Sequence, residues 1–175
     1  MSNTTLHADT RWRALECLTV PSVLRDWFSD PDSLTSRLRR HGTFRVAPGA
    51  SWIGRPTFDE RTLLAHSGRR FALIREVMLL LDDTPVVEAR SVLPLQSLRH
   101  ANRGLANMGS RPLGEELYRH PAAQRDQVWV RYGMTPAGRG PCWGRQSRFI
   151  KRGQPLLVAE HFLPALWRRV GGTGI

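Results

Sequence analysis

A single carboxylate, Glu160, stands in the middle of the apolar run PLLVAEHFLPAL at residues 155–166. If the run is a strand, Leu156, Val158 and Phe162 share the face of Glu160, so the carboxylate is expected to point into the interior. A buried carboxylate is costly unless a partner compensates it. Desolvation also raises the pKa of a carboxyl group and can make it a general acid or base. The sequence therefore predicts a compensating partner for Glu160, either another side chain or a substrate.

The strand before this run supplies a candidate partner. The segments PCWGRQSRFI and PLLVAEHFLPAL flank KRGQ, which has the composition of a tight turn. With Arg152 and Gly153 at the centre of the turn, antiparallel pairing places Arg145 opposite Glu160. An internal ion pair is one interpretation of Glu160 and a general acid or base is the other. Both hold if Arg145 tunes the carboxyl group.

A second hairpin is predicted from RFALIREVMLLL and TPVVEARSVLP, joined by two aspartates at 82–83. This turn would place Arg75 directly opposite Arg90 on a largely apolar face. Like charges in that position destabilise a sheet, and more so where the dielectric is low. The arrangement makes sense if an anion binds between them, because the planar guanidinium suits a carboxylate. The alternative is that Arg75 pairs with Glu76 or Glu88, or reaches solvent.

Composition limits the classes of partner. The chain of 175 residues has 26 Lys and Arg against 15 Asp and Glu, which gives a net charge of +11. Lys151 is the only lysine, and the arginines are scattered rather than clustered. No helix-turn-helix, zinc finger or aromatic-basic sheet motif occurs, so we expect no nucleic-acid partner. The positive field should still attract small anionic substrates.

The sequence indicates neither a membrane span nor a metal site. No apolar run approaches 18 residues, and the N-terminus lacks the apolar core of a signal peptide, so we expect a cytoplasmic protein. Cys17 and Cys142 are too few and too far apart for a disulfide framework or a zinc site. The histidines lack the spacing of metal ligands.

The elements that position these residues follow a simple order. Helical segments are expected in the first forty residues, with Asp32 or Ser33 as one N-cap and Gly42 as a stop. The strand GTFRVAPGASWIG is expected to break at Pro48. Two short helices, LQSLRHANRGLANMG ended by Gly109 and RPLGEELYRH, precede the strand candidate DQVWVRYGM. Hairpins with grouped helices predict a single α+β domain with an antiparallel sheet over 1–175, with loose ends at 1–10 and 170–175.

The chain resembles the chorismate lyase (chorismate pyruvate-lyase) family in three segments that occur in the family's order: LIREVMLLLDDTPVVEARSVLP, LANMGSRPLGEELY and WGRQSRFIKRGQPLLVAEHFLPAL. The segment DSLTSRL near the N-terminus is similar but less specific. The resemblance implies an antiparallel sheet with helices packed on it and flaps that close over a buried site.

The resemblance also implies roles for five residues. Arg75 would hold the ring carboxylate of substrate and product, and Glu160 would meet the ring hydroxyl on the opposite side. Leu113 and Leu34 would supply backbone contacts and apolar walls. The related protein carries methionine where this chain has Leu34, so only apolar character and backbone position transfer. Arg90 matches an arginine near the site and would stabilise the departing enolpyruvyl group.

The activity implied is the conversion of chorismate to 4-hydroxybenzoate and pyruvate, the first committed step of ubiquinone biosynthesis. Elimination with aromatisation needs no metal or redox cofactor, and flaps over the site imply product inhibition. We expect a monomer. The alternatives are a non-catalytic module of the same fold that senses small aromatic acids, and a nucleic-acid-binding protein. Sensor modules usually follow a winged helix-turn-helix domain, and no such domain fits before residue 71.

Overall fold

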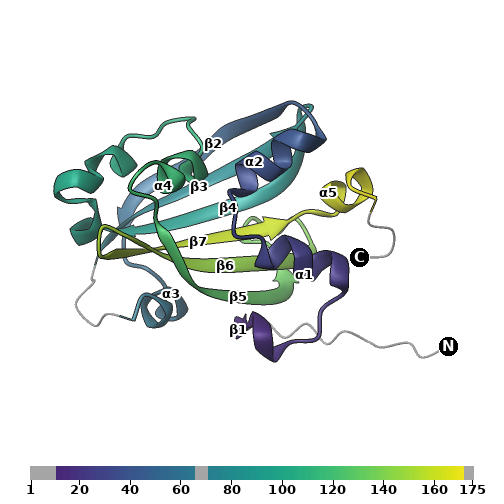
Figure 1. Cartoon of the computed structure of the whole chain (residues 1–175), viewed down its shortest axis with the longest axis horizontal. Helices are drawn as coiled ribbons and strands as arrows, with labels where there is room; N and C mark the ends of the chain where they lie inside the picture. The colour runs from purple at the N-terminus through teal and green to yellow at the C-terminus, as the bar shows by residue number, and fades with distance from the viewer. Residues whose placement is uncertain (1–10, 66–70, 172–175) are drawn as a thin grey trace.

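A computed structural model of the protein describes residues 11–65 and 71–171. These residues form one antiparallel sheet of seven strands in the order β1-β5-β6-β7-β4-β3-β2, with short helices packed against it (Figure 1). The predicted single-domain α+β architecture built from hairpins is therefore confirmed. The loose ends expected at 1–10 and 172–175 lie outside the described residues, whereas Val170, also expected to be loose, packs against the core.

The elements are short and follow one another closely. The strands are β1 (Arg13–Ala14), β2 (Phe44–Gly54), β3 (Ala72–Leu81), β4 (Thr84–Pro94), β5 (Gln124–Met134), β6 (Pro141–Lys151) and β7 (Gln154–Phe162). The α-helices are α1 (Ser22–Ser29), α2 (Leu34–Leu38), α3 (Phe58–Leu63), α4 (Leu113–Tyr118) and α5 (Pro164–Arg169). The 3-10 turns are η1 (Leu15–Cys17), η2 (Arg39–His41), η3 (Leu95–Leu98) and η4 (His100–Ala106).

The β6–β7 hairpin has the predicted register. Arg152 and Gly153 adopt φ values of 53° and 73°, the left-handed conformations of a tight two-residue hairpin turn. Such a turn matches the twist of the strands and fixes their pairing. Arg145 consequently lies opposite Glu160.

The β3–β4 hairpin has the predicted turn but not the predicted register. Asp82 and Asp83 both have positive φ, as the turn requires. Leu81 and Leu80 pair with Thr84 and Pro85 next to the turn. The next residue of β3, Leu79, lies opposite Val87, so Val86 is an extra residue that bulges from β4. Every β4 side chain beyond the bulge is offset by one position.

This offset overturns the predicted pair of facing arginines. Arg75 lies opposite Ser91, and Arg90 lies opposite Glu76. Since successive side chains point to opposite faces of a strand, a shift of one residue sends the two guanidinium groups to different faces of the sheet. We call the face that carries Arg75 and Glu160 the cavity face and the other the reverse face.

Helices cover both faces. Helices α1, α2 and α4 lie over the cavity face (Figure 1). Their apolar side chains form two buried clusters with the sheet, one around Phe28 and Phe162 and one around Leu117 and Phe149. A smaller apolar cluster on the reverse face includes Leu64, the residue that follows α3.

Several elements differ from the sequence-based prediction. The helix expected over LQSLRHANRGLANMG is two 3-10 turns, η3 and η4, and β2 continues through Pro48 with a shift in register instead of breaking. Ser33 occupies the N-cap position of α2 but its side chain makes no capping hydrogen bond. Three elements were missed: β1, α3 and α5. A signal for α3 was available, because Thr57 and Glu60 form a capping box.

Candidate active site

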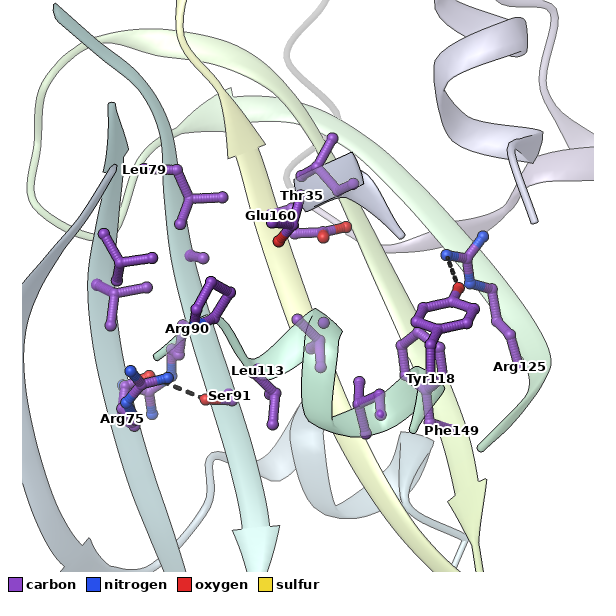
Figure 2. Close-up of a pocket in the computed structure, with 18 residues that line it drawn as sticks. Thr35, Arg75, Leu79, Arg90, Ser91, Leu113, Tyr118, Arg125, Phe149 and Glu160 are labelled. Carbon is purple, nitrogen blue, oxygen red and sulfur yellow. Dashed lines mark hydrogen bonds between the residues drawn. The ribbon is translucent and has the colours of Figure 1, made fainter. Parts of the chain in front are cut away.

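A cavity lies between the cavity face of the sheet and helices α2 and α4 (Figure 2). It holds about 590 Å³ of space free of protein atoms, including open solvent at its mouth. Its walls are mainly apolar, and its border includes all five residues singled out from the sequence: Leu34, Arg75, Arg90, Leu113 and Glu160.

Arg75 provides a buried positive charge at one end of the cavity. It is buried, and its Nη2 donates to the main-chain oxygens of Gly109 at 2.5 Å and Arg111 at 3.1 Å. Among the described residues no carboxylate forms an ion pair with it. Burial lowers the pKa of the Arg75 guanidinium, because desolvation disfavours the charged form. A buried cation held only by neutral carbonyls is well suited to bind an anion.

Glu160 also lies on the cavity wall, and it forms the predicted ion pair with Arg145. Its Oε2 accepts a hydrogen bond from Nε of Arg145 at 2.7 Å and lies 2.6 Å from Nη2 in the ion pair. The Arg145 side chain is 1% exposed, and its Nη1 also donates to the main-chain oxygen of Trp27 at 2.9 Å. Arg145 thus ties the end of α1 to the carboxylate and fixes its orientation.

The ion pair determines what Glu160 can do. With Oε2 held by the Arg145 guanidinium, Glu160 is oriented to serve as a hydrogen-bond acceptor in the cavity. Its second oxygen, Oε1, accepts no hydrogen bond from the residues described. One oxygen is therefore held by Arg145 while the other is available to a hydroxyl group in the cavity. The two interpretations of Glu160 are compatible in this geometry.

Sequence reasoning missed three polar residues at the Glu160 side of the cavity: Thr35, Tyr118 and Arg125. Tyr118 donates from its hydroxyl to the main-chain oxygen of Pro31 at 2.7 Å. Burial raises the pKa of Tyr118, so it stays a neutral hydroxyl. No motif marks these residues, because α2, α4 and β5 come together only in the folded chain. Arg125 immediately precedes the strand predicted over DQVWVRYGM, so that prediction did not include it either.

Arg90 borders the cavity but its guanidinium is engaged on the reverse face. Its Nε donates to Glu60 at 2.7 Å and its Nη1 to Glu76 at 2.8 Å. The Trp52 ring lies 5.5 Å from the guanidinium carbon. Arg90 is therefore a charge bound by two carboxylates, which is the opposite of Arg75. The resemblance implied a contact between Arg90 and the enolpyruvyl group, but we do not propose it, because Glu60 and Glu76 already bind the guanidinium.

Helices α2 and α4 form the side of the cavity opposite the sheet. Leu34 and Thr35 come from α2, and Leu113 from α4, where it stands beside the cavity in Figure 2. Gly114 allows the helices to approach, since a Cβ atom there would lie 2.7 Å from Oγ of Ser33. The end of α4 is held by Lys151, whose buried ammonium group donates to four main-chain oxygens, those of Glu116, Leu117, Arg119 and Pro121.

The reverse face of the sheet carries a buried histidine, His161. No group of three or more His, Cys, Asp or Glu side chains in the described ranges is placed to hold a metal. His161 is 2% exposed, and its Nε2 lies 3.1 Å from Nη2 of Arg131. Burial, and then the charge of Arg131, lower the pKa of His161 to about 4.

This histidine predicts how the protein responds to acid. Because the pKa of His161 falls from 6.5 in the unfolded chain to about 4 in the fold, the unfolded state binds the proton more tightly. Its contribution is complete above pH 6.5 and is lost as the pH falls towards 4, about 3 kcal/mol in total. In urea unfolding at pH 7 and pH 4.5, wild type should lose more stability than His161→Asn. A difference between the two proteins that does not change with pH would contradict this.

Comparison with known proteins identifies the family of the chain. The sequence model of a family described as Chorismate lyase matches residues 6–172. A protein of Alcanivorax borkumensis named "Probable chorismate pyruvate-lyase" is 63% identical over 94% of this chain and 81% of its own length. The chain belongs to the chorismate lyase family. This member of the family is therefore a lyase, and a protein of the same name from Thiobacillus denitrificans is 42% identical over 83% of this chain and 85% of its own.

Solved structures place the chorismate lyase family member in a wider fold group. The ligand-binding domain of a GntR-family transcriptional regulator from Bordetella bronchiseptica matches with a TM-score of 0.53 and 16% identity, over 70% of this chain and 86% of that one. A possible transcriptional regulator of Bacillus subtilis matches with a TM-score of 0.55 and 10% identity. This chain covers 61% of the B. subtilis chain, and that match extends over 72% of this one. These likenesses concern the fold alone.

None of the described helices combines the length and the apolar character needed to cross a bilayer.

Proposed function

We propose that the protein converts chorismate to 4-hydroxybenzoate and pyruvate. The observation that carries the proposal is the pairing of opposite chemistries on one apolar cavity. Among the residues that the structure describes, Arg75 offers a buried cation without a carboxylate partner, and Glu160 offers a carboxylate oxygen without a hydrogen bond. An aromatic acid with a hydroxyl para to its carboxylate has the matching groups at its two ends. Membership of the chorismate lyase family supports the same substrate.

The reaction is an elimination that makes the ring aromatic. The C3–O ether bond breaks and its electron pair leaves with the enolpyruvyl group. The proton on C4 leaves, and the electrons of that C–H bond form the new ring double bond. The departing enolate takes up a proton and becomes pyruvate. Because aromatisation supplies the driving force, the protein needs to orient the ring and stabilise charge, and no metal or redox cofactor is needed.

The cavity residues have distinct tasks in this scheme. Arg75 anchors the ring carboxylate through its free donors. Leu34 and Leu113 form apolar walls that hold the ring and exclude water. Glu160, held by Arg145, accepts the hydrogen bond of the C4 hydroxyl and is close enough to the C4 proton to act as its base.

Closure by α2 and α4 predicts that an aromatic product leaves slowly. Added 4-hydroxybenzoate should therefore reduce the initial rate competitively at concentrations comparable to the KM of chorismate. Initial-rate measurements at several product concentrations test this, with benzoate, which lacks the hydroxyl that Glu160 accepts, as the weaker control inhibitor. Rates that are insensitive to 4-hydroxybenzoate would contradict the closed-site account.

The product of the reaction suits a role in quinone biosynthesis. We assign the protein to the first committed step of ubiquinone biosynthesis, in the cytoplasm, acting as a monomer. A hydroxylated aromatic acid is a suitable precursor for a quinone ring, because it already carries one ring oxygen.

The second candidate function is a sensor of small aromatic acids that performs no reaction. The likeness of the fold to a GntR-family ligand-binding domain favours it. Such a module would bind 4-hydroxybenzoate in the same cavity but would leave chorismate unchanged, since fold alone does not fix function.

One experiment separates the two functions. Purified protein treated with a chelator is mixed with chorismate, and 4-hydroxybenzoate and pyruvate are followed by chromatography. We expect both products in equal amounts, at a rate proportional to protein concentration. Tight binding of 4-hydroxybenzoate without any turnover would support the sensor, and turnover that stops on chelation and returns with metal would contradict the cofactor-independent reaction.

A further inference from the structure

The substrate has a second carboxylate that the residues assigned so far do not bind. On the proposed function, Arg75 holds the ring carboxylate and Glu160 meets the hydroxyl on C4. The enolpyruvyl ether is attached to C3, next to C4 and away from the ring carboxylate. Its own carboxylate therefore belongs at the Glu160 side of the cavity. A cation should be found there.

Two of the candidate cations are already occupied. Arg145 forms an ion pair with Oε2 of Glu160 and donates to the carbonyl of Trp27. Arg90 lies on the reverse face between Glu60 and Glu76. Neither has a free positive charge to offer to an anion in the cavity.

Arg125 on β5 is the remaining cation on the cavity border. Figure 2 shows it beside Tyr118, on the side of the cavity away from Arg75. Its Nη1 donates to the main-chain oxygen of Asp30 at 2.5 Å and its Nη2 to the Tyr118 hydroxyl at 3.2 Å. Its guanidinium carbon lies 5.2 Å from the centre of the Phe149 ring. These contacts hold the guanidinium in place without neutralising it.

Two observations indicate that Arg125 has an unused capacity to bind an anion. Its Nε is buried and has no hydrogen-bond partner in the described part of the chain. Within 11–65 and 71–171 no carboxylate forms an ion pair with it, because nearby Asp30 is bound by Arg37 and Asp126 by Arg148. A buried donor without a partner is costly, which is understandable if a ligand supplies the missing acceptor.

The charges around the cavity also match a dianion. Apart from Arg90, which Glu60 and Glu76 neutralise on the reverse face, three arginines border or support it, Arg75, Arg125 and Arg145, against the single carboxylate of Glu160. The surplus of two positive charges equals the charge of the proposed substrate. Burial, and then the charge of Arg145, lower the pKa of the Arg125 guanidinium, and the smaller opposing effect of the Glu160 carboxylate does not cancel them.

We propose that Arg125 binds the carboxylate of the enolpyruvyl group and that Tyr118 positions the guanidinium for it. Arg75 then serves substrate and product alike, whereas Arg125 serves only the dicarboxylate. The charge of Arg125 also stabilises the enolate as the ether bond breaks. After the reaction the aromatic product no longer contacts Arg125.

The test compares two ligands that lack the second carboxylate with one that carries it. The probes are 4-hydroxybenzoate, 3-methoxy-4-hydroxybenzoate and the stable diacid 3-(carboxymethoxy)-4-hydroxybenzoate. Their affinities are measured by calorimetry for wild type, Arg125→Gln and the control Arg119→Gln. Arg119 is a suitable control because it follows Tyr118, carries the same charge and is 67% exposed.

We expect Arg125→Gln to weaken binding of the diacid about tenfold or more, since a charge-assisted hydrogen bond is lost. Binding of the two monoacids should change less than threefold, and Arg119→Gln should change none of the three. Equal losses for all three ligands would show a merely structural role and overturn the proposal. An unchanged affinity for the diacid would overturn it as well.

A second variant and the reaction itself complete the test. If Arg125→Gln does not fold, Arg125→Lys keeps the charge but loses the planar fork, and the ratio of diacid to monoacid affinity should still fall; an unchanged ratio overturns the proposal. For Arg125→Gln the KM of chorismate should rise while inhibition by 4-hydroxybenzoate stays the same. If wild type selects the diacid through Arg125 but does not turn over chorismate, the proposed function fails and the recognition by Arg125 stands.

Discussion

Glu160→Gln should reduce the turnover of chorismate by roughly 10²–10⁴-fold. Glutamine keeps the shape of the side chain, but it cannot take up a proton and accepts a hydrogen bond less strongly than a carboxylate. The KM should change much less, because Arg75 continues to hold the ring carboxylate. The measurement is kcat from the rate of 4-hydroxybenzoate formation at saturating chorismate. Turnover within twofold of wild type would exclude a role for Glu160 in proton transfer.

The loss of stability in this variant must be separated from the loss of chemistry. Arg145 is 1% exposed, and removal of its carboxylate partner should cost about 3–5 kcal/mol of folding stability. Glu88→Gln is the matched control, because Glu88 is also a buried acid but its side chain lies on the reverse face of β4, the strand next to β7. Its Oε2 lies 3.8 Å from Nε of Arg139. It should lower stability but keep turnover within about twofold. Activities are compared well below the melting temperature of each variant.

Arg75→Gln should weaken the binding of chorismate and of 4-hydroxybenzoate together, by roughly 30-fold or more, as expected when one partner of a buried charge pair is truncated. The matched control is Arg90→Gln on the adjacent strand. Arg90 is bound to Glu60 and Glu76 on the reverse face, so this variant should lose stability while its affinity for product stays within about threefold. Calorimetric titration with 4-hydroxybenzoate gives both values.

This pair of variants tests the register of β3 and β4 as well as the chemistry. Equal losses of product affinity in both variants would mean that both guanidinium groups reach the ligand, as the facing pair predicted from the turn requires. An unchanged product affinity in Arg75→Gln would exclude its anchoring role. If loss of the contacts to Gly109 and Arg111 prevents Arg75→Gln from folding, Arg75→Lys replaces it in the test, because lysine keeps the charge.

The contrast between the two hairpins explains what a sequence can predict here. In β6–β7 the turn residues fix the register and no bulge follows, so the Arg145–Glu160 pair could be derived from spacing alone. In β3–β4 the turn was equally clear, but the bulge at Val86 left no signal in the sequence. Because the period of a strand is two, that single residue reversed the face of Arg90.

The cavity roof could not be derived from local patterns. Helices α2 and α4 are far apart in the chain and meet only because Gly114 lets them approach, while Lys151 holds the end of α4 from yet another element. Arg125 likewise reaches the cavity only because β5 lies beside β6 in the sheet. Long-range packing of this kind is not encoded in periodicity, so the residues that complete the site had to come from the fold.

A crystal structure of the protein with 4-hydroxybenzoate tests the central claim most directly. The account predicts one ligand in the cavity, with its carboxylate within hydrogen-bond distance of the Arg75 guanidinium and its hydroxyl donating to Oε1 of Glu160, while Oε2 remains bound to Arg145. Arg125 should stay without contact to this monoacid. A ligand bound in the reverse orientation, or bound outside the cavity altogether, would contradict the assignment of Arg75 and Glu160.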